Sequence, residues 1–137
     1  GLIEVTTSNP DSVPVLTFAH DREARRKMST ARSNRAFPEN TAVLRELVRL
    51  RDQQARLLGF PSHAHAAMAD KMMGSPERAA EFLERMHVVV SAAAKREYDE
   101  LLAFAQQRDP GVEQLKAYDI TYVSNLLSSE KFGVDQK

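Results

Sequence analysis

The sequence predicts a mostly α-helical chain with one long helix and a short N-terminal strand. Over most of the chain, apolar residues recur every three or four positions, the spacing of one helix face. The run Ser75-Pro76-Glu77 places a capping hydroxyl, a proline and an acid where the first turn of a helix favours them. We therefore divide the single predicted segment, residues 1–137, into an extended region over 1–18 and a helical region over 21–137.

Two short runs at the N-terminus favour strands. Residues 2–7 and 13–18 are rich in β-branched side chains, and a turn-forming cluster separates them. Pro14 cannot donate to a strand ladder, which argues against a regular hairpin. Since a weak strand pair is not stable alone in water, its partner strands are expected outside this chain or in a second copy.

Five helices are predicted after this region. Asp21 is the N-cap of the first, and Gly59 and Gly74 end the second and third, whereas the last is expected to end without a cap. The predicted ranges are 22–33, 40–58, 62–73, 76–108 and 118–129. One predicted buried face of the second helix comprises Val43, Leu44, Leu47, Val48, Leu50, Leu57 and Leu58. The apolar side of the long helix comprises Ala79, Phe82, Leu83, Met86, Val89, Val90, Ala93, Leu101 and Phe104.

Composition excludes several classes of protein. A chain of 137 residues with 42% apolar and 28% charged residues is typical of one globular unit. Nineteen basic and nineteen acidic side chains cancel, which argues against a nucleic-acid partner. No apolar run is long enough to span a bilayer, so no membrane partner is expected. The absence of cysteine excludes disulfides and thiolate metal sites and is compatible with a cytoplasmic protein.

No catalytic or metal-ligating residue is predicted in this chain. None of its four histidines is followed by glutamate, so the zinc motif H-E-x-x-H does not occur. His63 and His65 lie about 200° apart around a helix, so a regular helix cannot present both to one metal ion. We interpret them as surface or half-buried histidines of a helix and not as metal ligands.

Two other groups of residues have a structural and a functional interpretation. The basic run Arg22, Arg25, Arg26, Lys27, Arg32 and Arg35 could bind an anionic partner, but a solvated, salt-bridged face is favoured. Tyr118 and Tyr122 are one helical turn apart and share a face. That face is a candidate to bind substrate by lining a channel. A packing contact between helices, with each hydroxyl hydrogen-bonded, is the favoured alternative.

Several segments, taken in order, resemble the thimet oligopeptidase-like family of zinc peptidases, and the resemblance extends over nearly the whole chain. The matching segments are 23–27, 40–51, 55–60, Ser75-Pro76-Glu77 with Phe82-Leu83, Tyr118-Asp119-x-x-Tyr122, and 133–136. The sequence departs from the family pattern at Tyr118, where tryptophan is common, and at His65-Ala66-Ala67, where an aromatic residue is common.

This resemblance implies a much larger, two-lobed, nearly all-helical enzyme that hydrolyses short peptides with one zinc ion. The family's zinc ligands, general base and transition-state residues lie C-terminal to the matched region, so none is carried onto this chain. The chain is expected to be a non-catalytic helical portion, inactive alone and binding no zinc. Its partners are expected to be the remainder of the parent chain and, through exposed apolar surface, other copies of itself. The alternative is a stand-alone helical protein-interaction module.

Overall fold

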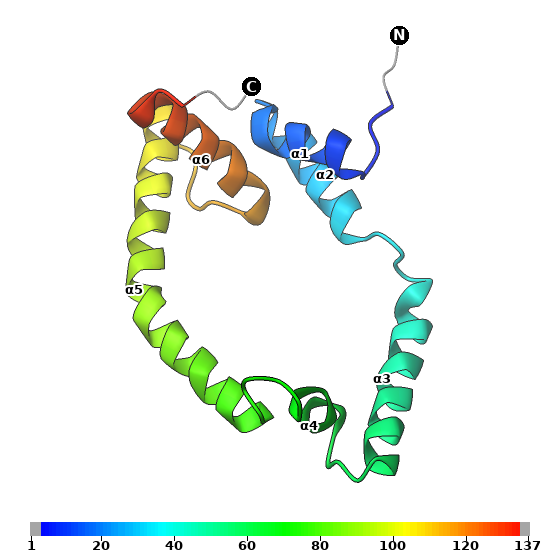
Figure 1. The fold of residues 1–137 in the computed structure, drawn as a ribbon. Helices are drawn as coiled ribbons and strands as arrows, with labels where there is room; N and C mark the ends of the chain where they lie inside the picture. The colour runs from blue at the N-terminus through cyan, green and yellow to red at the C-terminus, as the bar shows by residue number, and fades with distance from the viewer. Residues whose placement is uncertain (1–3, 135–137) are drawn as a thin grey trace. The chain divides into compact units, whose positions relative to one another are not determined.

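The computed structural model describes residues 4–134, and within that range the chain forms six α-helices and no β-strand (Figure 1). The helices are α1 (Asn9–Phe18), α2 (Arg22–Ser33), α3 (Asn40–Leu57), α4 (His63–Met68), α5 (Pro76–Arg108) and α6 (Ala117–Phe132). The prediction of a mostly α-helical chain with one long helix is confirmed, since α5 has 33 residues.

The predicted N-terminal strand is wrong wherever the structure describes it. Residues 13–18 belong to α1, and residues 4–7 have no regular secondary structure. The first part of the other predicted strand, residues 2 and 3, lies outside the described range.

Local and tertiary contacts explain why α1 is a helix. Pro10 lies in its first turn, where the fixed φ of proline suits a helix. The Thr6 amide donates a hydrogen bond of 3.0 Å to the Asp11 carboxylate just before the helix. Packing of α1 against α2 and α6 buries Ser12 and Thr17. Since β-branching lowers helix propensity only slightly, these contacts outweigh it.

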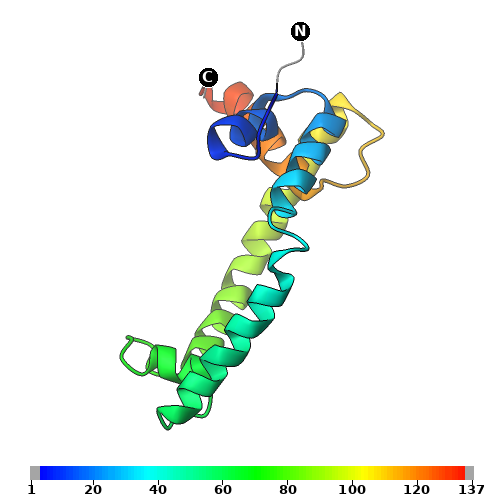
Figure 2. The ribbon, with the colours of Figure 1, turned by 90° about the vertical axis from the view of Figure 1, so that its right-hand side faces the viewer.

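The described residues form two compact units. Unit 1 comprises residues 4–35 and 95–134, and contains α1, α2, α6 and the C-terminal part of α5. Within it α1, α2 and α6 contact one another (Figures 1 and 2). Its buried core residues are Phe104, Ala105, Leu115 and Val123. This core joins the end of α5 to α6 and to the loop between them.

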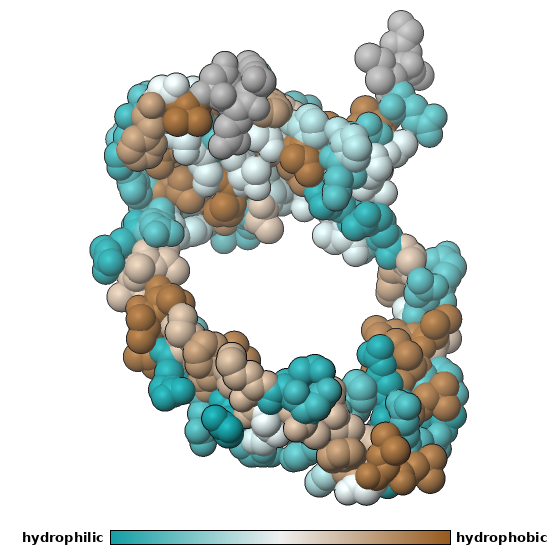
Figure 3. Space-filling view, in the orientation of Figure 1, coloured by the Kyte–Doolittle hydropathy of each residue, from teal (hydrophilic) through white to brown (hydrophobic). Residues whose placement is uncertain are grey.

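Unit 2 comprises residues 36–94, with α3, α4 and the N-terminal part of α5. Here the predicted buried face of α3 is wrong: its side chains are exposed, from 40% at Leu47 to 88% at Leu57. Most of the apolar side of α5 within this unit, including Phe82 and Val89, is also exposed. Figure 3 shows hydrophobic surface over α3 and over the part of α5 that belongs to this unit. The apolar spacing is present, but no other part of unit 2 covers it.

Helix ends agree with the sequence in most places. Asp21 caps α2 by accepting a 2.8 Å hydrogen bond from the Glu23 amide, and α2 has its predicted bounds. Gly59, at φ +82°, follows α3 in the left-handed conformation expected of a residue beyond a helix end. The predicted uncapped end of α6 is wrong, because Gly133 adopts φ +63° and donates its amide hydrogen to the Ser129 carbonyl.

The predicted third helix is shorter than expected. It ends at Met68, and the chain to residue 74 forms turns held by hydrogen bonds from Lys71 to Met68 and from Gly74 to Lys71. These bonds span three residues instead of four, so they do not continue the α-helix. None of the helices in the described range is long and apolar enough to cross a membrane.

Candidate functional site

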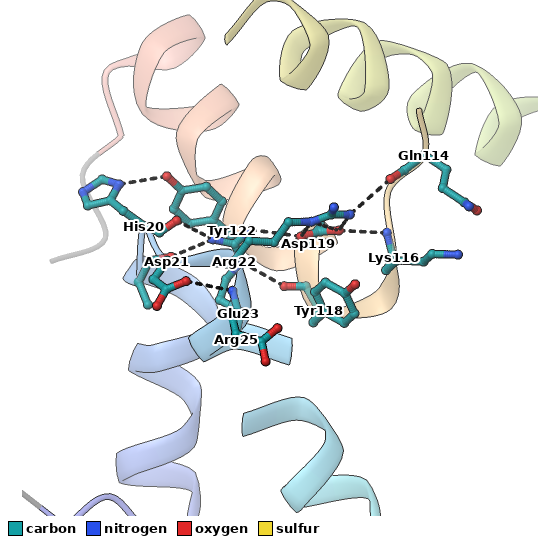
Figure 4. A network of polar contacts seen from close by, with 11 residues as sticks. His20, Asp21, Arg22, Glu23, Arg25, Gln114, Lys116, Tyr118, Asp119 and Tyr122 are labelled. Atoms are coloured by element: carbon teal, nitrogen blue, oxygen red, sulfur yellow. Dashed lines mark hydrogen bonds and ion pairs between the residues drawn. The ribbon is translucent and has the colours of Figure 1, made fainter. Parts of the chain in front are cut away.

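The polar cluster of unit 1 is centred on Asp119, in the first turn of α6. Its carboxylate accepts hydrogen bonds from Arg22 Nη2 at 2.7 Å, from Arg22 Nε at 3.1 Å and from Arg25 Nη2 at 3.0 Å. It also accepts the Lys116 amide hydrogen at 3.0 Å, which caps α6. Figure 4 shows these bonds converging from α2 and from the turn before α6. A single carboxylate thus ties the start of α2 to the start of α6.

Arg25 is the buried cation of this cluster, with only 4% of its surface exposed. Its Nη1 donates to the Ala19 carbonyl at 2.8 Å and to the His20 carbonyl at 3.1 Å, and its Nε donates to the Tyr118 carbonyl at 3.2 Å. With Asp119, these acceptors take most of the five hydrogens of the guanidinium. The Arg25 side chain therefore joins three segments of backbone.

The two tyrosines predicted as a pair lie beside these arginines. The Arg25 guanidinium carbon lies 4.0 Å from the centre of the Tyr122 ring, and that of Arg22 lies 5.6 Å from the Tyr118 ring. The Tyr122 hydroxyl lies 2.8 Å from His20 Nδ1 (Figure 4). Tyr122 makes the interhelical packing contact that was favoured; substrate contact by either tyrosine stays a prediction.

The charges in the cluster hold Asp119 ionised. Burial by itself raises the pKa of a carboxyl group. Hydrogen bonds from Arg22, the Lys116 amide and Arg25 outweigh burial, so the pKa of Asp119 lies below its usual range. The hydrogen bonds to Asp119 in turn raise the pKa of Arg22. The site therefore carries two guanidinium cations against one carboxylate anion at neutral pH.

A pocket of about 210 Å³ lies next to this cluster in unit 1. Its polar lining comprises His20, Arg22, Arg25, Arg108, Asp109 and Asp119. Its apolar lining comprises Phe104, Ala105, Val112, Leu115, Tyr122, Val123 and Leu126. The pocket lining is thus partly polar, with residues from around the start of α2, the end of α5 and the first turn of α6, and partly apolar, with residues of the core of the unit.

The prediction of a solvated, salt-bridged basic face is wrong for Arg25, which is buried, and is met at Arg22, whose half-exposed side chain pairs with Asp119. It is confirmed at Arg26, which pairs with Glu23 at the surface. Asp119 was not predicted as the partner of Arg22 and Arg25. The sequence does show Asp119 as a lone acid in the first turn of α6. Nothing in the sequence relates this acid to arginines more than 90 residues away.

The other three histidines lie in unit 2. Ser62 caps α4, and its hydroxyl lies 2.8 Å from His65 Nδ1, whereas His65 Nε2 lies 3.2 Å from a Glu77 carboxylate oxygen. Glu77 is exposed, and its pKa is lowered by hydrogen bonds at the start of α5 and by His65. Among residues 4–134, no group of three or more histidine, aspartate or glutamate side chains is placed to hold a metal ion.

Comparison with known proteins gives a consistent result. The family model described as peptidase family M3 matches residues 15–137. Oligopeptidase A of Salmonella typhimurium is 30% identical over 141 aligned residues, which cover 97% of this chain and 21% of that protein. Probable cytosolic oligopeptidase A of Arabidopsis thaliana is 29% identical, covering 97% of this chain and 19% of that protein. Mitochondrial intermediate peptidase of Chaetomium globosum is 34% identical, and the aligned residues cover 93% of this chain and 16% of that protein.

This chain spans about a fifth of the length of the curated relatives it matches. The family match nevertheless leaves out only the first 14 residues of the chain, so it includes α2 to α6 and the whole Asp119 cluster. The chain therefore belongs to peptidase family M3, the thimet oligopeptidase-like family that its sequence resembles.

Proposed function

We propose that this chain is a non-catalytic helical segment of a larger zinc-dependent peptidase that hydrolyses short peptides. The observation that carries the proposal is the family match over residues 15–137, together with relatives named as oligopeptidases. The family resemblance implies that zinc is held by an H-E-x-x-H motif and a further glutamate. The zinc would activate a water molecule to attack the peptide carbonyl.

The residues that the structure describes do not fit that zinc site. Zinc in a peptidase takes three protein ligands from histidine and carboxylate side chains. No such group of three is assembled among residues 4–134, and the sequence has no H-E-x-x-H motif. No catalytic step is therefore assigned to these helices. We propose that the zinc ligands and the general base are supplied by other parts of the peptidase, in a cytoplasmic protein.

The exposed apolar faces of unit 2 support a scaffold role. The α3 side chains Val43, Leu44 and Val48 are each more than half exposed, as are Leu83 and Val89 on α5. A soluble monomer rarely exposes so many apolar side chains along one element. We propose that the remainder of the peptidase packs on these faces, so that unit 2 is a structural part of a two-lobed enzyme. The substrate of that enzyme is proposed to be a short peptide.

The decisive experiment compares the complete gene product with the 137-residue chain. Both are assayed with short fluorogenic peptides, before and after removal of metal by a chelator and after addition of zinc. The proposal expects zinc-dependent hydrolysis by the complete protein and none by the chain. Zinc-dependent turnover by the purified chain, or a complete protein that lacks H-E-x-x-H, contradicts the proposal.

The same exposed apolar faces also favour one alternative, a stand-alone helical interaction module. The two functions differ in what the apolar faces contact. In the peptidase, cleavage of the complete protein by a nonspecific protease should leave α3 protected by the rest of the enzyme. In an interaction module, α3 should be protected only when a separate protein is bound.

A further inference from the structure

The exposed apolar face of α3 contains one charged residue. At about 100° per residue, the apolar side chains of α3 and of the residue after it cover about half of the helix circumference. Arg51 lies within that half, with Leu47 and Ala55 one turn away on either side and Leu44 and Leu58 two turns away. None of the other charged residues of α3, which the structure describes in full, lies in that half. Arg51 is therefore a single cation inside an apolar surface.

Unit 2 supplies no counter-ion for Arg51. The two acids of α3 have partners of their own, since Glu46 pairs with Arg49 at 2.6 Å and Asp52 pairs with Arg56 at 2.8 Å. Within residues 36–94, the Arg51 side chain forms no ion pair and no hydrogen bond, and the residue is exposed. Solvent hydrates the guanidinium in this unit, so a counter-ion for the covered state has to come from the segment that covers the face.

Covering the apolar face changes the surroundings of Arg51. Leu44, Leu47 and Leu58 are 61%, 40% and 64% exposed, and a segment that packs on them removes water from the residue between them. A buried guanidinium without a partner is strongly unfavourable, whereas one that meets a well-oriented carboxylate is tolerated. Arginine can also extend along a surface to reach water. That route is hindered at Ala55, on the nearer edge of the face, because Ala55 is 1% exposed and thus already covered.

Unit 1 contains a buried arginine whose charge is already paired. Arg25 is 4% exposed there and pairs with Asp119 at 3.0 Å. The planar guanidinium can bind a carboxylate through parallel hydrogen bonds, which restrict the distance and orientation of the two segments. A buried pair of this kind therefore specifies where two segments meet, while apolar contacts supply most of the stabilisation.

A second copy of α3 does not supply the counter-ion. In a pair of α3 helices joined through their apolar faces, both Arg51 side chains enter the interface, and neither helix has an acid in that half of its surface. Glu46 and Asp52 lie outside it, in their pairs with Arg49 and Arg56. The charge of the face therefore favours a different segment. The relatives, of which this chain spans about a fifth, have ample further chain to provide one.

We propose that the segment of the peptidase that packs on α3 presents one aspartate or glutamate to Arg51, with apolar side chains around it. This inference rests on the proposed function, in which the remainder of the peptidase covers unit 2. The leucines around Arg51 contact the apolar side chains of that segment, and the pair of Arg51 with the carboxylate sets its position along α3. A shift of one helical turn separates the two charges, so only one register satisfies both.

The test is hydrogen exchange of the complete gene product, measured by mass spectrometry on peptides of α3. Arg51→Met keeps a long unbranched side chain and removes the charge, so the carboxylate is buried alone. Exchange of the α3 amides should become about a hundredfold faster than in the unmodified protein, because loss of one partner of a buried pair favours opening of the interface. Arg51→Lys keeps the charge and should accelerate exchange less.

The controls use a second arginine of the same helix. Arg45→Met removes an exposed arginine on the polar side of α3 and should leave exchange of the complete protein unchanged. Neither methionine variant should change exchange in the 137-residue chain, because Arg51 and Arg45 are both exposed there. If Arg51→Met prevents the complete protein from folding, Arg51→Lys and Arg45→Lys provide the same comparison.

Unchanged exchange in Arg51→Met overturns this proposal. If α3 is nevertheless protected in the unmodified complete protein, the proposed function stands, because the face is covered and Arg51 reaches water. If α3 exchanges as fast in the complete protein as in the 137-residue chain, no segment covers the face and both proposals fail. A crystal structure of the complete protein should show a carboxylate oxygen from outside residues 1–137 within about 4 Å of the Arg51 guanidinium. Carbonyl oxygens or water alone at that position overturn this proposal.

Discussion

Arg25 and Asp119 form an ion pair of 3.0 Å in which the side chains are only 5% and 3% exposed. The two residues are 94 positions apart, so the pair joins α2 to α6 directly. Burying two charges is costly unless hydrogen bonds satisfy the remaining donors and acceptors. Here the backbone carbonyls of Ala19 and His20 and the Lys116 amide do so. The pair therefore specifies how these two helices meet within unit 1.

Removal of the Asp119 carboxylate should strongly destabilise unit 1. In Asp119→Ala, Arg25 stays buried without its counter-ion, and loss of one partner of a buried pair costs about 3–5 kcal/mol. The measurement is urea unfolding followed by circular dichroism. The control is Asp99→Ala, which removes an exposed pair with Lys95 and should cost less than about 1 kcal/mol. Equal losses in the two variants would show that the buried pair contributes no more than a surface one.

The stability of unit 1 should fall in acid because of the same carboxylate. The pKa of Asp119 is lower in the folded state than the unfolded value of about 3.9. The unfolded state therefore binds more protons in acid, and this contribution is present above about pH 4 and lost as the pH falls through the folded pKa. The free energy of unfolding, measured from pH 6 to pH 2.5, should decline less steeply in the Asp119→Asn variant than in the unmodified chain. Exposed carboxylates whose pKa is also lowered, such as Glu23 and Glu46, are present in both proteins. Their contributions to the pH dependence of stability therefore cancel in the comparison.

The N-cap of α2 should contribute measurably to stability. Asp21 accepts the Glu23 amide hydrogen, so Asp21→Ala leaves that donor without its side-chain acceptor. The expected loss is about 1 kcal/mol, and Asp21→Asn should lose only a few tenths because asparagine also caps helices. Thermal or urea unfolding measures both. If the asparagine variant loses as much as the alanine variant, the cap is not the source of the effect.

Leucines in the two units should differ sharply in their effect on stability. Leu115 is 8% exposed in the core of unit 1, so Leu115→Ala should cost about 2–5 kcal/mol. Leu57 is 88% exposed on α3, so Leu57→Ala should change the free energy of unfolding by less than about 0.5 kcal/mol. A large loss from Leu57→Ala in the isolated chain would mean that the α3 face is buried, for example by self-association, which light scattering of the same sample would reveal.

Local signals in the sequence were sufficient to predict most helix bounds. Asp21 as an N-cap, Ser75-Pro76-Glu77 as a helix start and Gly59 beyond a helix end act through neighbouring backbone groups, and the structure has each as predicted. Helical spacing likewise predicted that Tyr118 and Tyr122 share one face of α6.

After residue 20, the sequence by itself thus determined where most of the chain is helical, where most of those helices begin and end, and which side chains share a helix face, because these properties depend on residues within a few positions of each other. Only the tertiary structure decided that residues 13–18 are helical, that the α3 stripe stays exposed and that Arg25 is buried against Asp119. Each of these outcomes depends on contacts between distant segments. Periodicity marks a face for packing but does not specify the partner that covers it.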